Sequence, residues 1–589
     1  MLELFFRDFS QILSFSSKFP LNFTSIFFWV LFGISLLLYA LVYKKTALRN
    51  AFLFFISLFF YYKTSGVFFV LLIFSTLADF LIGHGLNRTL SIWKRQIWVA
   101  TSVIVNLSVL SYFKYPYFIS DFLSEGFNIN WDPLPVHAIW SNAYLGTDFI
   151  ESKILLPVGI SFYTFQCLSY IIDIYRRKIQ PVKSLLDFGF YVSFFPQLVA
   201  GPIVRASEFI PQLYQPYKLT RAAFGLGLFW IINGLLKKIV LADYVASNFA
   251  DRVFAQPTLY SGLECLLALF AYSLQVYADF SGYTDVAIGV ALLMGFTLTK
   301  NFNSPYKAIN LGDFWRRWHI SLSSWLRDYL YIPLGGNREG SFASYIIVFT
   351  SFFVLAIMAE SWKVPIFMAI FLLVIFFLTL WVITFRNWLN TNINLMLTML
   401  LGGLWHGSSW NFVVWGGLNG LGLIFYKFWK KIRPWNPKSS WIGKIFGIFT
   451  TLLFITFTRA WFRSETWDNA LLILSRIWTA FDPSITLDIL SGFWRPLSLM
   501  LFGYLIHWIP EIQKENYRRK FINSSLAVQW CSALLVTRSS SSRYIGVNCC
   551  TSEERFKTRE ISLWVSWFVS NRFHTCFQSK LSSDGPRLT

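Results

Sequence analysis

Long apolar stretches without charge recur along this chain of 589 residues. Several approach or exceed the roughly 20 residues that a helix needs to cross a bilayer; the clearest are 19–43, 96–113, 154–172, 364–385 and 387–426. Less regular candidates lie at 51–62, 67–78, 186–204, 222–236, 259–278, 286–299, 341–359, 444–458 and 496–510. The pattern therefore predicts an all-α polytopic membrane protein with about a dozen membrane-embedded helices.

The polar segment 300–340 interrupts this pattern, yet it is rich in tryptophan and tyrosine. On a helix, one apolar stripe with spacings of three and four would consist of Trp315, Trp318, Leu322, Trp325 and Leu326. The basic residues Arg316, Arg317 and Arg327 would fall elsewhere. Such an amphipathic helix is predicted to lie in the membrane interface or to re-enter the protein. His319 lies at its middle, where it either packs among the tryptophans or belongs to a functional site.

His406 stands alone in an uncharged stretch, since residues 387–426 contain no Asp, Glu, Lys or Arg and no other histidine. The glycines beside it would allow a second helix or a substrate to approach closely. One interpretation is a hydrogen bond between packed helices. The other is catalysis or transport, because ionisable groups at membrane depth are costly and usually functional. From this pattern alone, both interpretations stay open.

Two carboxylates, Asp279 and Asp285, interrupt an otherwise uncharged stretch from Leu266 to Thr299. We predict a structural role, in which they cap helix ends at a Ser-Gly break by accepting backbone N–H groups. The alternative is that they line a polar cavity.

The net charge of +21 is distributed in short basic groups beside the apolar stretches. These groups lie at 44–49, 88–95, 176–178, 427–433 and 514–520. By the positive-inside rule, such loops are predicted to be cytoplasmic. Residues 115–152 contain acidic residues but no Lys or Arg, so this loop is predicted to face outward. The expected partner is the lipid bilayer, and no nucleic acid is expected.

The chain is predicted to form one membrane domain over about 1–521, followed by a different segment at 522–589. That last segment is rich in serine, holds four of the six cysteines and lacks a clean apolar stretch long enough to span a bilayer. Cys167 and Cys265 lie in apolar stretches, where a thiol behaves as a small hydrophobic group. Neither has a metal-ligand spacing, so no metal site is expected.

Several motifs carry a resemblance to a known family. They are LPVGISFYTFQCLSYIIDIYR (156–176), FFPQLVAGPIVR (194–205), YADFSGYTDVAIG (277–289), NFNSPYKAINLGDFWRRWHISLSSWLRDYLYIPLGGNR (301–338) and TMLLGGLWHGSSWNFVVWGGLNGL (398–421). In this order they resemble the membrane-bound O-acyltransferase (MBOAT) family. More narrowly, they resemble its bacterial branch, which contains the alginate O-acetyltransferase membrane subunit and the D-alanyl transfer protein of teichoic acid modification. The resemblance runs from about residue 20 to about residue 515.

The resemblance implies a helical bundle around a central tunnel, with the acyl donor entering from the cytoplasm and the acceptor from outside. It implies that His406 removes the proton from an acceptor hydroxyl group, and that His319 orients the acceptor or stabilises the developing oxyanion. The candidate substrate-binding residues in the same motifs are Trp315, Arg316, Trp405 and Asn411. No bound cofactor is expected, and acetyl-coenzyme A is expected as the donor substrate.

The chain departs from the family pattern between its two histidine motifs, where extra apolar sequence lies near 341–386. We predict two spans joined by a tight turn around Lys363 and Pro365. Because an even number of crossings returns the chain to the same side, His406 keeps its expected orientation.

The expected function is transfer of acetyl groups to hydroxyl groups of a cell-surface polysaccharide, in the bacterial cytoplasmic (inner) membrane. A periplasmic acetyl-transfer protein is the expected protein partner. One alternative is transfer of D-alanyl or another acyl group to a cell-envelope polymer. Others are a transporter and a non-catalytic scaffold of an exopolysaccharide machine. A transporter would favour two related halves with broken helices, and the sequence shows no internal repeat.

Overall fold

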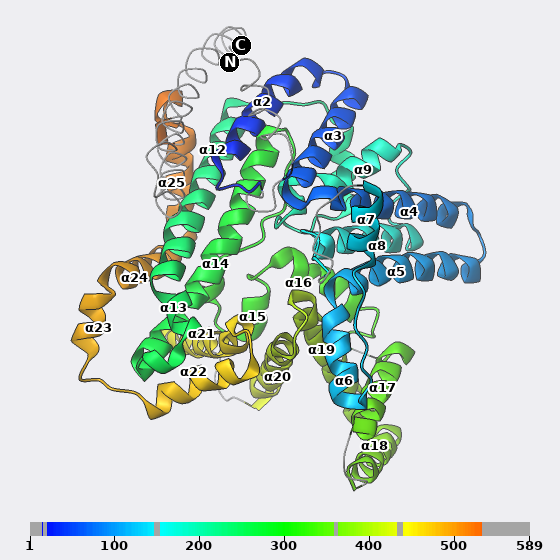
Figure 1. The fold of residues 1–589 in the computed structure, drawn as a ribbon, viewed down its shortest axis with the longest axis vertical. Helices are drawn as coiled ribbons and strands as arrows, with labels where there is room; N and C mark the ends of the chain where they lie inside the picture. The colour runs from blue at the N-terminus through cyan, green and yellow to red at the C-terminus, as the bar shows by residue number, and fades with distance from the viewer. Residues whose placement is uncertain are drawn as a thin grey trace.

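All regular secondary structure in the described part of the chain is helical (Figure 1). The computed structural model describes residue 15 and residues 21–145, 154–337, 339–358, 363–432, 440–529 and 531–532. For these residues, the all-α class predicted from the sequence is confirmed.

The first half of the fold packs around an aromatic core. Its longer helices are α2 (Ile26–Val42), α3 (Thr46–Ser65), α4 (Phe69–Arg88), α5 (Ile92–Lys114), α8 (Ile160–Tyr175) and α9 (Leu185–Ser193). The shorter ones are η1 (Gly66–Phe68), α6 (Pro116–Phe127), α7 (Val136–Leu145), α10 (Phe195–Leu198) and α11 (Ala206–Leu213). Residues of α2, α3, α8 and α9 share their core with the C-terminal half of α14 (Gly262–Leu293), which ties this half of the fold to the second.

The second half is built along α12 and α14. Helix α12 (Arg221–Leu236) continues through the π-helical turns η2 (Lys237–Asp243) and η3 (Ala246–Ala250) into α13 (Asp251–Ala255). The short elements around α14 are η4 (Pro257–Leu259), η5 (Pro305–Lys307), α15 (Leu311–Trp315), α16 (Ile320–Leu326) and η6 (Arg327–Tyr331). The remaining helices are α17 (Phe342–Met358), α18 (Lys363–Trp381), α19 (Ile383–His406), α20 (Trp410–Ile432), α21 (Trp441–Arg463), α22 (Trp467–Thr479), α23 (Thr486–Gly492), α24 (Trp494–Trp508) and α25 (Glu511–Ile522).

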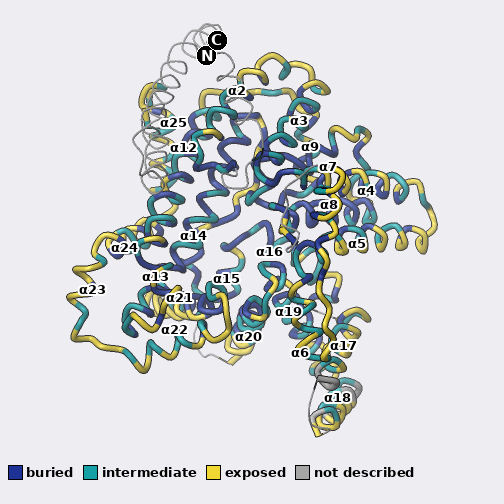
Figure 2. The backbone as a smooth tube through the Cα atoms, viewed as in Figure 1, coloured by how far each residue is buried: buried dark blue, intermediate teal, exposed yellow. Residues whose placement is uncertain are grey.

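Helix α14 lies at the centre of the molecule and packs against α12, α21, α22 and α24; much of it is buried (Figure 2). The backbones of α12 and α14 touch at Gly234, where a Cβ atom would lie 2.4 Å from the Gly282 carbonyl oxygen. Gly227 and Gly289, two turns away, meet in the same manner. Small residues at such contacts are typical of closely packed membrane helices.

The two carboxylates of α14 do not cap helix ends, because α14 is one continuous helix. The Asp285 Oδ2 atom accepts hydrogen bonds from Lys237 Nζ at 2.6 Å and from Asn233 Nδ2 at 2.7 Å. The Asp279 Oδ1 atom lies 2.6 Å from Lys238 Nζ. The predicted break and capping role are therefore wrong. The carboxylates instead join α14 to η2 by ion pairs, and Asp285 also joins it to α12 by the hydrogen bond from Asn233. These contacts satisfy the charges.

Five helical segments are long and apolar enough to cross a membrane in the described part of the chain. They are Thr46–Arg88, Ile92–Lys114, Arg221–Ala255, Gly262–Leu293 and Trp441–Arg463. The helices α23 and α24, which meet at 88°, would bring the number to six if they form one bent span. Several segments of this length and hydropathy in one chain are typical of a multi-pass membrane protein. The candidates 259–278 and 286–299 both overlap the single helix α14, although 294–299 lie beyond its end. The candidate 186–204 is divided between α9, α10 and irregular chain.

The extra apolar sequence at 341–386 forms the helices α17 and α18. They pack on each other and on α19, and they project from the rest of the molecule in Figure 1. The turn does not fall at Lys363 and Pro365 as predicted, because both residues belong to the first turn of α18. Residues 359–362, which connect the two helices, lie outside the described residues. A single residue, Val382, separates α18 from α19, so the helix that ends at His406 follows the pair directly.

The boundary predicted near residue 521 falls at the end of α25. Just beyond it, Gln529 Nε2 donates to the carbonyl oxygens of Phe521 and Ile522, at 3.0 and 2.9 Å. The first residues after α25 therefore fold back onto its end. The rest of the predicted tail, 533–589, lies outside the described residues.

The loop predicted to be periplasmic and the basic group predicted to be cytoplasmic lie at opposite ends of α20. Phe118 of α6 belongs to the predicted outer loop, and its ring centroid lies 5.2 Å from that of Trp410, the first residue of α20. Lys430 and Lys431 of the predicted cytoplasmic group lie in the last turn of this 23-residue helix. A helix of that length extends about 35 Å, which is enough to separate the two sides of a bilayer.

Cysteines introduced at Ser124 and at Lys431 are therefore expected to differ in labelling by a membrane-impermeant thiol reagent. In a background without other cysteines, Ser124→Cys should react on intact spheroplasts. Lys431→Cys should react only after the membrane is permeabilised. Both positions are exposed, so access from one side and not burial decides the result. Labelling of Lys431→Cys but not Ser124→Cys on intact spheroplasts would reverse the predicted orientation.

Candidate functional site

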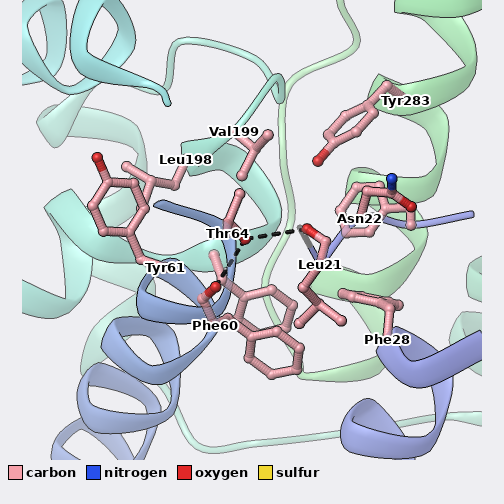
Figure 3. Close-up of a pocket in the computed structure, with 11 residues that line it drawn as sticks. Leu21, Asn22, Phe28, Phe60, Tyr61, Thr64, Leu198, Val199 and Tyr283 are labelled. Atoms are coloured by element: carbon pink, nitrogen blue, oxygen red, sulfur yellow. Dashed lines mark hydrogen bonds between the residues drawn. The ribbon is translucent and has the colours of Figure 1, made fainter. Parts of the chain in front are cut away.

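The pocket in Figure 3 is lined mainly by apolar and aromatic side chains of α2, α3, α10, α14 and the residues beside them. Its Thr64 hydroxyl group is engaged with the carbonyl oxygens of Leu21 and Phe60, at 3.1 and 2.9 Å. Neither His319 nor His406 lines this pocket. The pocket suits an apolar group, whereas the side chains that can perform chemistry gather elsewhere.

His406 is the last residue of α19, at the turn into α20. The two helices are in backbone contact, because a Cβ atom on Gly403 would lie 2.3 Å from the Phe412 carbonyl oxygen. A Cβ atom on Gly416 would lie 2.3 Å from the Met399 carbonyl oxygen. Glycine at both positions permits this contact, which fixes the helix end that carries His406.

Replacing Gly403 by alanine is expected to destabilise the protein, because the added methyl group must push two backbones apart. We expect a loss of about 1–3 kcal/mol, measured as a lower melting temperature in detergent, together with reduced activity. The matched control is Gly417→Ala in α20, where the added Cβ atom would lie 3.4 Å from the flexible Leu400 Cδ2. Equal melting temperatures for the two variants would contradict this account of the packing.

The last carbonyl groups of α19 are held by the end of α5. The Tyr115 hydroxyl group donates to the Leu404 carbonyl oxygen at 2.9 Å, and Lys114 Nζ donates to the Trp405 carbonyl oxygen. Lys114 Nζ also donates to Ser161 Oγ at 3.1 Å. Terminal carbonyl groups of a helix lack intrahelical partners, so these contacts satisfy them and orient the end of α19.

His406 is partly buried against three aromatic rings. Its ring centroid lies 5.0, 5.1 and 5.3 Å from those of Trp405, Trp415 and Phe462. Among the described residues, neither of its ring nitrogens has a hydrogen-bond partner. These nitrogens are therefore available to a substrate.

The predicted amphipathic helix over 315–326 is broken at its centre. The helices α15 and α16 are separate, and His319 between them has a left-handed backbone with a φ of 43°. The prediction of one continuous helix is wrong, although Trp318, Leu322 and Trp325 of its apolar stripe are buried. A left-handed conformation is unfavourable for a non-glycine residue and is often found at functional sites.

The contacts of Asn301 fix which nitrogen of His319 carries the hydrogen. Asn301 Oδ1 accepts from the Ser321 backbone N–H at 3.1 Å and from Ser321 Oγ at 3.0 Å. His319 Nδ1 lies 3.2 Å from the same acceptor oxygen and must therefore carry the hydrogen. His319 Nε2 then presents a lone pair, and it is buried without a partner among the described residues. Burial lowers the pKa of His319 to about 3, so the ring is neutral at physiological pH.

Trp405 lies between the two histidines. Its ring centroid is 5.0 Å from that of His406 and 5.9 Å from that of His319. The Trp405 Nε1–H group is buried and has no partner in the described part of the chain. Three of the residues singled out from the sequence are thus brought together, although their motifs are far apart in the chain.

The other candidate substrate-binding residues differ in their relation to this cluster. Trp315 borders it, since its ring centroid lies 5.8 Å from that of Trp415. Arg316 lies outside it, with a side chain that is 72% exposed. Asn411 is buried, and its Nδ2 donates to the Ser464 carbonyl oxygen at 2.9 Å, which links α20 to the end of α21.

Arg459 of α21 belongs to the cluster, although the sequence pattern did not single it out. Its guanidinium carbon lies 4.6, 5.1 and 6.0 Å from the ring centroids of Trp318, Phe462 and Trp415. Trp415 and Phe462 also contact His406. The signal that could have identified Arg459 is its charge inside the apolar segment FITFTRAWF (454–462), because charges at membrane depth are costly.

The cluster therefore combines two imidazole groups and one guanidinium group among aromatic rings. A neutral imidazole can accept the proton of a hydroxyl group, and a guanidinium group can donate several hydrogen bonds to an anion. Such a site can activate a hydroxyl nucleophile and stabilise negative charge on a carbonyl oxygen. The arrangement is suited to acyl transfer.

Comparison with known proteins gives an independent result. Residues 175–392, which include His319 and end before His406, match the membrane-bound O-acyltransferase family. The peptidoglycan O-acetyltransferase of Helicobacter pylori is 33% identical over 448 residues, 71% of this chain and 71% of that protein. A protein of Azotobacter vinelandii named "Probable alginate O-acetylase AlgI" is 38% identical over 357 residues, 60% of this chain and 58% of that protein. The teichoic acid D-alanyltransferase of Bacillus subtilis is 27% identical over 304 residues, 51% of this chain and 65% of that protein.

Proposed function

Because this chain belongs to the membrane-bound O-acyltransferase family, we propose that it transfers an acetyl group from a cytoplasmic donor to hydroxyl groups of a cell-surface polysaccharide. The observation that carries the proposal is the cluster of His406 and His319, whose free nitrogens have no partner among the described residues. The relatives named as acetyl-transferring proteins are 33% and 38% identical, whereas the D-alanyltransferase is 27% identical. This difference favours an acetyl group over a D-alanyl group.

In the proposed reaction, His406 is the general base. A neutral imidazole has an ordinary pKa of about 6.5, which suits removal of a proton from an attacking hydroxyl group near neutral pH. His319 orients the acceptor, because its Nε2 lone pair can accept a hydrogen bond from an acceptor hydroxyl group. The hydrogen on Nδ1 is committed to Asn301, so the neutral ring has no N–H to offer to an oxyanion.

The proposal includes the surroundings of the site. The donor is acetyl-coenzyme A, and a periplasmic acetyl-transfer protein passes the group on to the polysaccharide. The protein works in the bacterial cytoplasmic membrane, where about a dozen membrane-embedded helices of residues 1–521 surround a central tunnel. Trp315 and Trp405, which border the histidine cluster, contact the substrates. Residues 522–589 are a separate segment without a catalytic role.

The test is reconstitution of the wild-type protein in liposomes with radiolabelled acetyl-coenzyme A on one side and a surface polysaccharide fraction on the other. Acyl transfer should consume the donor and label the polysaccharide when the periplasmic partner is supplied. Movement of polysaccharide without donor consumption would identify a transporter instead. No consumption and no movement would favour a scaffold. In cells, a deletion strain should lose acetyl esters from its surface glycans and regain them on complementation.

A further inference from the structure

Arg459 carries a buried charge without a counter-charge in the described structure. Its side chain is 1% exposed, and its Nε atom is enclosed without a partner. No carboxylate among the described residues forms an ion pair with it within 4.0 Å. Arg463, one turn further along α21, instead lies 2.9 Å from Asp251. A buried cation without compensation is costly, so its retention needs a reason.

Other buried arginines are satisfied by the backbone, and Arg459 is not. Arg49 and Arg95 also lack an ion pair, but each donates to at least two backbone carbonyl oxygens. Arg459 instead lies over aromatic faces and interacts with the Tyr306 hydroxyl group. Aromatic faces stabilise a cation without accepting its edge N–H groups, so the Nε–H group, which has no acceptor among the described residues, remains available.

The position of Arg459 places this charge beside the reacting groups. The rings of Trp415 and Phe462 contact both Arg459 and His406. The ring of Trp318, which precedes His319 in the chain, lies 4.6 Å from the guanidinium carbon. His406 is within electrostatic range of His319, Lys114 and Arg459. Negative charge that develops near His406 would therefore meet a preorganised cation.

We propose that Arg459 is a catalytic residue that donates hydrogen bonds to the acyl oxygen of a thioester donor as this oxygen becomes negatively charged. This inference rests on the proposed acyltransferase function. The acceptor hydroxyl oxygen forms a bond to the acyl carbon, its proton passes to His406, and the carbonyl π electrons move onto the acyl oxygen. When the carbonyl re-forms, the carbon–sulfur bond breaks, and the thiolate leaves with the proton from His406. The products are an ester and a thiol.

This assignment completes the site chemically. His319 in the tautomer fixed by Asn301 presents a lone pair at Nε2, so it accepts hydrogen bonds and does not donate them there. Lys114 Nζ is already engaged with the Trp405 carbonyl oxygen and Ser161 Oγ. Arg459 is the cation of the cluster whose Nε–H group is buried without an acceptor in the described part of the chain. A buried N–H donor on a cation suits a negatively charged oxygen as its acceptor.

The test compares Arg459→Met and Arg459→Lys with Arg463→Met, which removes an arginine from the same helix outside the cluster. Methionine keeps an unbranched apolar chain in the aromatic setting, so that folding is retained. We expect Arg459→Met to lower kcat about 100- to 1,000-fold, with little change in KM for acetyl-coenzyme A. Arg459→Lys should recover part of the loss, and Arg463→Met should keep kcat within a few-fold of wild type. Each rate is divided by the concentration of folded protein, which is determined by size-exclusion chromatography and by the thermal melting curve.

A second measurement separates charge stabilisation from ground-state binding. A coenzyme A thioether, which lacks the thioester carbonyl group, should bind wild type and Arg459→Met with equal affinity. Weaker binding of the thioether, or a raised KM with unchanged kcat, would overturn the proposal and place an anionic substrate group on Arg459. Unchanged kcat per folded protein would also overturn it and leave a packing role. If wild type itself fails to consume any acyl donor, the proposed function fails as well, whereas an active wild type with an active Arg459→Met removes this inference alone.

Discussion

Alanine in place of His406 is expected to abolish acyl transfer while the protein stays folded and inserted. Loss of a general base typically lowers the rate about 100- to 10,000-fold, so acetyl esters on surface glycans should fall below detection. Folding should survive, because the ring is partly exposed and makes no hydrogen bond to another described residue. The measurements are ester content in a complemented deletion strain and donor consumption by the purified protein.

The matched control for this variant is His84→Ala in α4. His84 is partly buried and its Nδ1 lies 2.9 Å from the Phe80 carbonyl oxygen, away from the histidine cluster. It should keep its activity, which would show that loss of a histidine ring does not by itself inactivate the protein. Normal ester levels in cells that express His406→Ala at the wild-type level would contradict the assignment of His406 as the general base.

The importance of His406 was predictable because the signal is local in the sequence. One ionisable residue lies in a stretch without formal charge, and its neighbouring glycines indicate close helix packing. The structure places it at the end of α19 with Gly403 in backbone contact with α20. The all-α class and the membrane character were predictable for the same reason, since apolar stretches of sufficient length are visible along the chain.

Features that depend on three-dimensional partners were not predictable in this manner. The ion pairs of Asp279 and Asp285 use lysines of η2, which lies about 40 residues earlier in the chain, so the proximity is not visible in the sequence. Arg459 stands out in the sequence as a charge inside an apolar segment, but its contacts with Trp318 and Trp415 are visible only in the structure. The wrong role of the two carboxylates and the omission of Arg459 have the same origin, because the pattern of one helix shows which face is apolar and not which side chain lies opposite.

The break at His319 was missed for a different reason. The spacing of Trp318, Leu322 and Trp325 correctly indicates a buried stripe, but this spacing is also compatible with a short helix that begins after His319. The left-handed backbone at His319 is stabilised by Asn301, whose carbonyl oxygen accepts from the Ile320 N–H at 2.9 Å. Asn301 is distant in sequence from that turn, so its influence is not visible in a helical period.

Removing the ring of His319 is the second change for which a large effect is expected. His319→Gly should lower kcat about 100-fold, since a misplaced acceptor typically costs that much. Glycine tolerates the left-handed backbone, so the loss is due to the ring and not to strain. His319→Asn should recover part of the activity, because asparagine also tolerates this conformation and its carbonyl oxygen can accept a hydrogen bond. Full activity of His319→Gly per folded protein would exclude His319 from the reaction.

The tautomer of His319 gives this prediction a pH dependence with a definite sign. Because burial lowers the pKa of His319 to about 3, its protonation should not affect the wild-type rate between pH 5 and 8. In Asn301→Asp, a carboxylate beside Nδ1–H favours the imidazolium form and raises the pKa of His319. Protonation removes the Nε2 lone pair, so this variant should lose activity as the pH falls, over a range where wild type does not. The control is Asn303→Asp, at an exposed position two residues away, which should keep the pH–rate profile of wild type. If wild type, Asn301→Asp and Asn303→Asp all show the same pH–rate profile, His319 Nε2 does not accept a hydrogen bond from the substrate.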